Sequence, residues 1–238
     1  MMKYEISEEV AHINGHPEKL VIFLHGYIDS DTSVDKRLSY LIDNLDNTAI
    51  HIPQAPLQCE IHERKRQWYS MHRFDPDDAR KTVATMEECA VFYNRMGDGF
   101  NEAFMYLNPY IDQCLNEYQL EDKDLYICGF SQGAMLAVYT SLMREETIGG
   151  CISFSGILAP HGYLMKNHNA TPDMLLIHGD ADTLVRYEAL EFSRSRLEQM
   201  GCRTTTFTVS GGQHTISEDG LKQAVDYIKQ HSIRKIAV

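Results

Sequence analysis

The sequence predicts a three-layer α/β fold, in which a mostly parallel sheet lies between two layers of helices. Short apolar runs alternate with longer stretches of helical periodicity over most of the chain, as in successive β-α-β units. Several of the short runs are apolar without alternation, which is typical of strands covered on both faces. No repeat, low-complexity tract or linker interrupts the 238 residues. We therefore expect a single domain over residues 1–238, without a large cap domain.

The strands of this sheet are predicted from runs of apolar and β-branched residues. They are expected over residues 19–25, 48–52, 125–130, 150–154, 174–178 and 204–209. In open α/β sheets the chemistry lies in loops at the carboxyl ends of the strands, so the residues that follow these runs are the candidates for function.

The predicted helices fill the intervals between these strands. They are expected over residues 104–118, 133–144, 188–200 and a C-terminal stretch that begins after Ser217. Gly201 ends the third helix, and Ser217 is a suitable N-cap for the last. Because proline lacks an amide hydrogen, we expect the 104–118 helix to break at Pro109.

Charge and cysteine usage exclude several classes of protein. Lysine and arginine number 22 against 34 acidic residues, a net charge of −12, so we expect no nucleic-acid partner. The first twenty residues are polar, and the strongest apolar run, residues 20–24, is far too short to span a membrane. The six cysteines form no CxxC pair, which predicts reduced buried thiols in a cytoplasmic protein and no zinc site.

A nucleophile is predicted at Ser131, in the sequence Gly-Phe-Ser-Gln-Gly that follows the strand run Leu125 to Cys128. A serine at a sharp strand-to-helix turn needs glycine two residues to either side, because a Cβ there would collide with backbone. The following helix directs amide N–H groups towards the serine, where an oxyanion would form. The alternative is a glycine-rich turn that only packs tightly or binds a phosphate.

An acid and a base follow the next two predicted strands. Asp180 and Asp182 come after residues 174–178, and either carboxylate could orient a histidine. His214 comes after residues 204–209 and is the histidine placed to act as a general base. The order of serine, aspartate and histidine along the chain is that of an α/β-hydrolase.

The loop His25-Gly26-Tyr27 ends the first predicted strand. In the α/β-hydrolase arrangement one oxyanion donor comes from this loop and the other from the residue after the nucleophile. The backbone amides of Tyr27 and Gln132 are therefore the expected donors, and we expect His25 to brace the loop.

Several motifs in this order resemble the phospholipase/carboxylesterase family of α/β-hydrolases, which includes acyl-protein thioesterases and small bacterial esterases. The motifs are VIFLHG from residue 21, PxAP from 53, QWYS from 67, GFSQGA from 129, FSG from 154, HGDAD from 178 and GGQH from 211. The resemblance implies an α/β-hydrolase fold, Ser131 as nucleophile, Asp182 rather than Asp180 as acid, His214 as base, and a homodimer as an unsurprising state.

Two segments depart from the family pattern. Ile28 stands where the family often has glycine, and it would not adopt positive φ cheaply. Residues 82–104 include Gly97-Asp98-Gly99 and are interpreted as a glycine-hinged flap, with the core face of an ordinary helix as the alternative. Ile28, Trp68 and Leu158 are the expected substrate contacts.

These observations predict a cytoplasmic serine hydrolase that cleaves small-molecule or acylated-protein esters or thioesters without a metal or organic cofactor. A peptidase or lactonase on the same fold is one alternative. A non-catalytic binding protein that has kept the fold is another. A nucleotide-binding domain ranks last, because GxSxG lacks the lysine of a phosphate-binding loop.

Overall fold

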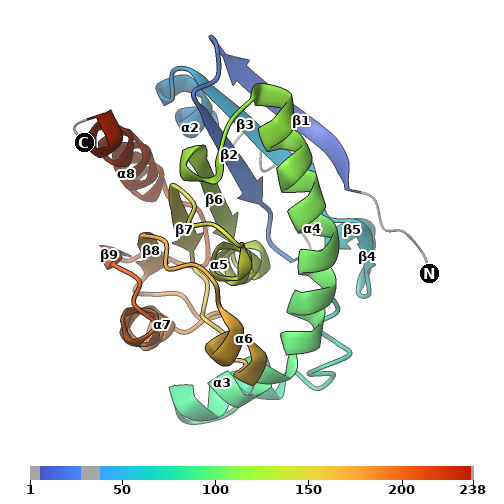
Figure 1. Cartoon of the computed structure of the whole chain (residues 1–238). Coiled ribbons are helices and arrows are strands. Elements are labelled where there is room, and N and C mark those ends of the chain that lie inside the picture. The colour runs from blue at the N-terminus through green and yellow to red at the C-terminus, as the bar shows by residue number, and fades with distance from the viewer. Residues whose placement is uncertain (1–5, 28–37, 237–238) are drawn as a thin grey trace.

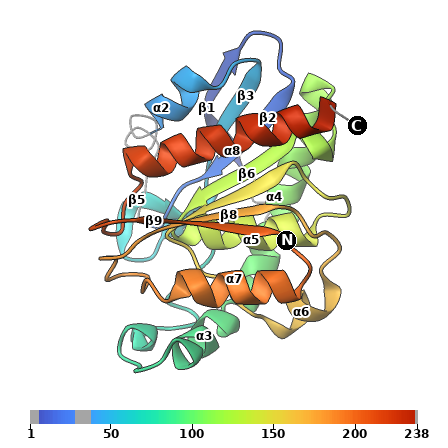
Figure 2. The same cartoon turned by 90° about the vertical axis from the view of Figure 1, so that its left-hand side faces the viewer.

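A seven-stranded sheet forms the centre of the molecule in the computed structural model, which describes residues 6–27 and 38–236 (Figures 1 and 2). The strand order is β1-β3-β2-β6-β7-β8-β9. The strands are β1 (Ser7–Asn14), β2 (Lys19–Leu24), β3 (Thr48–Gln54), β6 (Leu125–Phe130), β7 (Gly150–Phe154), β8 (Met174–Gly179) and β9 (Thr204–Val209). Only the β1–β3 pair of this sheet is antiparallel, so the predicted mostly parallel sheet is confirmed.

Helices cover both faces of the sheet. Helix α8 (Glu218–Ile236) and helix α2 (Ser39–Asn44) contact one another and share one core with Val21 and Phe23 of β2. Leu20, Ile22 and Leu24 of the same strand point the other way, into a second and larger core. That core is covered by α3 (Met86–Arg95), α4 (Gly97–Tyr118), α5 (Gln132–Met143), α6 (Gly162–Asn167) and α7 (Ala189–Gln199). Figure 1 shows α8 and α4 on opposite sides of the sheet, which confirms the three-layer α/β fold.

All six predicted strands are present, and three further strands are not predicted from the sequence. Strand β1 has the polar sequence SEEVAHIN and pairs only at the sheet edge, where an apolar run is not required. Strands β4 (Leu57–Cys59) and β5 (His62–Gln67) form a separate hairpin, in which β5 is largely charged. Strands with polar sequences lack the apolar runs from which the other six are predicted.

The predicted break at Pro109 is wrong, because α4 runs through it as one helix of 22 residues. Leu107 and Ile111, on either side of the proline, are fully buried and hold the helix against the core. Arg144, just after α5, donates to the side chains of Asn108 and Asp112, which lie one turn apart around the proline. This packing and these bonds outweigh the one helical hydrogen bond that proline removes.

The segment 82–104 forms α3 and the start of α4. Thr85 and Glu88 make a capping box that begins α3. A Cβ on Gly97 would lie 2.1 Å from the ring of His161, and one on Gly99 would lie 3.0 Å from Tyr69. These glycines therefore permit close packing. The role of the segment as a glycine-hinged flap stays a prediction.

The six cysteines are free and buried, as predicted. Burial raises the pKa of Cys151 to about 12 and that of Cys202 to about 12. Among the described helices, none is long and apolar enough to cross a membrane.

Candidate active site

Ser131 lies in the sharp turn between β6 and α5, with φ +53° and ψ −116°. Such a backbone conformation costs a residue with a side chain about 1–3 kcal/mol. Its amide is held by Phe154, whose carbonyl accepts the Ser131 N–H at 2.9 Å. A Cβ on Gly129 would lie 2.3 Å from the carbonyl oxygen of Gly133, which explains the first glycine of the motif.

The second glycine, Gly133, allows α5 to approach β2, and its replacement tests that contact. A Cβ there would lie 2.1 Å from the Leu24 carbonyl oxygen and 2.4 Å from that of His25, and backbone atoms of a central strand cannot move aside easily. We expect Gly133→Ala to lower the free energy of unfolding by about 3 kcal/mol or more, measured by urea denaturation.

Gly162→Ala is the matched control, because Gly162 also lies in the first turn of a helix but has no atom within 4 Å of the added Cβ. We expect it to leave stability unchanged or slightly raised. Equal stability of the two variants would show that the turn is not held by this contact.

Ser131, His214 and Asp182 converge from the ends of β6, β9 and β8. The Ser131 Oγ lies 2.9 Å from His214 Nε2, and His214 Nδ1 lies 2.7 Å from Asp182 Oδ2. Because Nδ1 faces a carboxylate, it carries the ring proton, and Nε2 is left to accept the serine hydroxyl.

Asp182 is held as a charged acceptor. Its Oδ1 accepts the amide hydrogens of Leu184 at 2.9 Å and Val185 at 3.0 Å. The ring of the buried His178 lies on its other side, with Nε2 3.4 Å from Oδ2. Burial opposes the charged form, but the nearby His178 ring and the hydrogen bonds from His214 and the Val185 amide outweigh it and hold the pKa of the Asp182 carboxyl well below its ordinary range. His178 Nε2 itself bonds the Val185 carbonyl at 2.9 Å.

Asp180, the other candidate acid, has a different contact. Its exposed carboxylate accepts the Gly211 amide hydrogen at 2.6 Å. The Ala181 amide also donates to the Gly212 carbonyl at 2.9 Å, so the loop of Asp182 and the loop of His214 are joined by backbone. Asp180 therefore braces the loop that carries the histidine.

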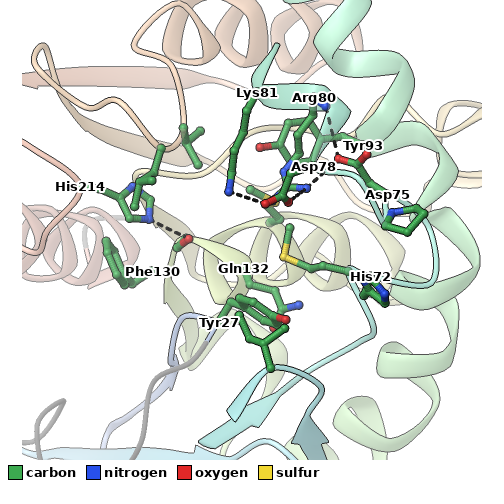
Figure 3. Close-up of a pocket in the computed structure, with 17 residues that line it drawn as sticks. Tyr27, His72, Asp75, Asp78, Arg80, Lys81, Tyr93, Phe130, Gln132 and His214 are labelled. Carbon is green, nitrogen blue, oxygen red and sulfur yellow. Dashed lines mark hydrogen bonds and ion pairs between the residues drawn. The ribbon is translucent and has the colours of Figure 1, made fainter. Parts of the chain in front are cut away.

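Tyr27 and Gln132, the expected oxyanion donors, line the same cavity as Ser131, and both are labelled in Figure 3. The Gln132 side chain is 1% exposed and fixed at both ends, because Oε1 accepts the Trp68 amide hydrogen at 3.0 Å and Nε2 donates to the Tyr69 carbonyl at 2.9 Å. His25 accepts the Ala55 amide hydrogen at Nε2, 3.0 Å away, and so braces the loop of Tyr27 as expected. Ile28 lies outside the described residues.

A cavity of about 480 Å³ opens in front of Ser131 and His214. Its apolar lining residues include Ile61, Leu184 and Val185. One side of the cavity comes from the segment between β5 and α3 and carries Asp75, Asp78, Arg80 and Lys81, with Tyr93 of α3 behind them (Figure 3).

Comparison with known proteins shows the family of the chain. A family model described as Phospholipase/Carboxylesterase matches residues 6–232. The chain belongs to the phospholipase/carboxylesterase family. It is 35% identical over 211 residues to acyl-protein thioesterase 1 homolog 1 of Dictyostelium discoideum, with 84% of each chain covered. It is 23% identical to acyl-protein thioesterase 1 of Candida albicans, over 91% of this chain and 94% of that protein.

A solved structure, that of esterase PE8, superimposes with a TM-score of 0.81 at 25% identity, covering 95% of this chain and 99% of the other. The fold is accordingly that of an α/β-hydrolase, and the protein is a hydrolase of the ester and thioester class.

Two expected substrate contacts of this phospholipase/carboxylesterase family member lie away from the cavity. Trp68 is fully buried and donates its indole hydrogen to the His25 carbonyl, 2.8 Å away, so it supports the Tyr27 loop from beneath. Leu158 is 2% exposed and its amide donates to Ser193 at 2.9 Å. Both side chains are buried in the core, and neither lines the cavity in front of Ser131.

The sequence analysis does not predict the charged side of the cavity, which is formed by Asp75, Asp78, Arg80 and Lys81. Its residues lie in the stretch DPDDARK, which has the composition of a solvated surface turn. Only the fold places this stretch opposite His214. Arg186 holds it there by donating to the carbonyls of Val83 at 3.0 Å and Ala84 at 3.1 Å.

Proposed function

We propose that this hydrolase cleaves carboxylic esters or thioesters through an acyl-enzyme on Ser131. The observation that carries the proposal is the continuous hydrogen-bonded path from Ser131 Oγ through the His214 ring to Asp182. In this arrangement the imidazole removes the serine proton as Oγ attacks the acyl carbon, and the ionised Asp182 stabilises the imidazolium that results.

The carbonyl oxygen becomes negatively charged when Oγ adds to the carbon. The amides of Tyr27 and Gln132 are proposed to donate to it, and one such donor lowers a barrier by about 3–4 kcal/mol. The bound Gln132 side chain supports this role, because a fixed backbone needs no rearrangement as the charge develops. His214 then gives its proton to the departing alcohol or thiol, and water repeats the sequence on the acyl-enzyme.

A fluorophosphonate probe tests the assembled site. We expect a single adduct on Ser131, located by intact mass and peptide mapping, and hydrolysis of short ester and thioester substrates that the probe abolishes. Protein shown to be folded that forms no adduct and hydrolyses no ester would contradict the proposal and favour a binding protein on this fold.

We also propose a cytoplasmic location and acylated substrates. The location is supported by six free, buried cysteines, which suit a reducing compartment. The substrate class is supported by the acyl-protein thioesterases among the relatives. A homodimer stays a prediction.

A further inference from the structure

One carboxylate of the chain is bound between two cations on the wall of the cavity. Asp78 Oδ1 lies 2.6 Å from Arg80 Nη1, and Asp78 Oδ2 lies 2.6 Å from Lys81 Nζ. These residues line the same cavity as Ser131 and His214. Figure 3 shows them across the cavity from His214, with the amine of Lys81 near the carboxylate of Asp78. We name Arg80 and Lys81 the cation pair.

Arg80 is fixed in place without help from Asp78. Its guanidinium also bonds Asp75 Oδ2 at 2.7 Å, and the Asp75 side chain is only 2% exposed. Asp75 is itself fixed by the amide hydrogens of Ala79 at 2.8 Å and Arg80 at 3.3 Å. The arginine would therefore keep its position if Asp78 moved away.

Asp78, in contrast, is an exposed and replaceable partner. Its side chain is 52% exposed, and that of Lys81 is 43% exposed. Burial opposes its charged form, but the bonds and charges of Lys81 and Arg80 together outweigh it and hold the pKa of the Asp78 carboxyl below the ordinary value, so it is ionised at neutral pH. The Asp78–Lys81 pair is exposed on both sides, and such pairs contribute about 0–1 kcal/mol. The Arg80 side chain is only 10% exposed, so a second carboxylate has to form a comparable bond to this guanidinium when it takes the place of Asp78.

An alkyl chain is a poor occupant of this side of the cavity. It would remove water from the cation pair and from Asp78 without replacing the lost hydrogen bonds, which is unfavourable. A carboxylate on the substrate would restore those bonds, and charge-assisted hydrogen bonds to arginine and lysine are among the strongest that proteins make.

We propose that the substrates of this hydrolase carry a carboxylate that displaces Asp78 from the cation pair while the ester or thioester carbonyl lies at Ser131. This inference rests on the function proposed for Ser131. It assigns to Arg80 and Lys81 the recognition of an anionic group, and to Asp78 the role of an internal competitor.

The test compares matched esters with and without a carboxylate. Monoethyl succinate carries the carboxylate on the acyl side and has the same acyl length as ethyl butyrate. Butyryloxyacetate carries the carboxylate on the alcohol side and has the same acyl group as ethyl butyrate. Each anionic ester is compared with ethyl butyrate. Hydrolysis is followed by proton release in a pH-stat. We expect kcat/KM to be about tenfold or more higher for at least one of the two anionic esters than for ethyl butyrate.

Substitutions of Lys81 and Asp78 test whether the cation pair recognises the carboxylate. The quantity compared is the ratio of kcat/KM for the preferred anionic ester to kcat/KM for ethyl butyrate. We expect Lys81→Met to lower the ratio about tenfold. Asp78→Asn removes the competing charge, and asparagine tolerates the positive φ of 52° at this position. We expect it to raise the ratio about fivefold.

Lys222→Met and Asp219→Asn on α8 are the matched controls. Lys222 and Asp219 form a pair with the same i,i+3 spacing as Lys81 and Asp78, and Lys222 is also 43% exposed. These variants should leave the ratio unchanged.

If ethyl butyrate hydrolysis depends on Ser131 but neither the Lys81 nor the Asp78 variant alters the ratio, the inference is overturned and the proposed function stands. Absence of all Ser131-dependent hydrolysis would overturn both.

Discussion

Ser131→Ala is expected to lower ester hydrolysis about 10³-fold or more while the protein remains folded. The variant removes the Oγ that lies 2.9 Å from His214 Nε2, and loss of a serine nucleophile in comparable hydrolases leaves only the contribution of binding and the oxyanion donors. Initial rates on ethyl butyrate, at enzyme concentrations high enough to detect residual turnover, measure the effect.

Ser155→Ala is the control for backbone strain. Ser155 also has positive φ, +50°, and also follows a strand of the central sheet, but it lies outside the path from Ser131 to Asp182. We expect it to keep most of the activity. Residual activity of Ser131→Ala above about one tenth of the wild-type value would show that the nucleophile has been wrongly assigned.

Asp182→Asn is expected to reduce kcat about 10⁴-fold. The reason is the orientation that the amide must adopt. The Leu184 and Val185 amide hydrogens require an oxygen acceptor, so the Nδ2 group would occupy the position of Oδ2 and face His214 Nδ1. The ring would then carry its proton on Nε2 and could no longer accept the proton of Ser131.

Asp180→Asn is the paired control for this prediction. Its carboxylate only accepts the Gly211 amide hydrogen, and an asparagine oxygen can do the same. We expect a change of a few-fold at most in kcat. If Asp180→Asn were the more damaging of the two, His214 would have to be oriented by the other carboxylate.

The lowered pKa of Asp182 sets the direction of a pH effect on stability. A carboxyl whose pKa is lower in the folded state contributes stability above its unfolded value, about 3.9, and loses it as pH falls towards the folded value. The negative charge on Asp182 is consequently present throughout the neutral range in which the proposed chemistry operates.

The sheet and the residues at its strand ends could be predicted because their signals are local. The apolar run of β6, the glycines around Ser131 and the polar residues after β8 and β9 each lie within a few positions of one another. The order of these groups along the chain is enough to bring them to one edge of a parallel sheet.

Other features depend on contacts that are distant in sequence. Pro109 remains inside a helix because Arg144, 36 residues away from Asn108, bonds across it. The wall with Arg80 faces the cavity because Arg186 holds the neighbouring backbone from 103 residues away. Trp68 is an expected substrate contact, but its side chain is fully buried and its indole hydrogen bonds the carbonyl of His25, 43 residues away.

The buried cysteines give the protein an internal reporter of its own opening. Alkylating reagents react with thiolates, and both the burial and the raised pKa values of Cys151 and Cys202 suppress that form in the native state. Modification by iodoacetamide therefore has to wait for unfolding, local or global, that exposes a strand or loop of the core. The rate of alkylation would measure how often the sheet opens, without any engineered label.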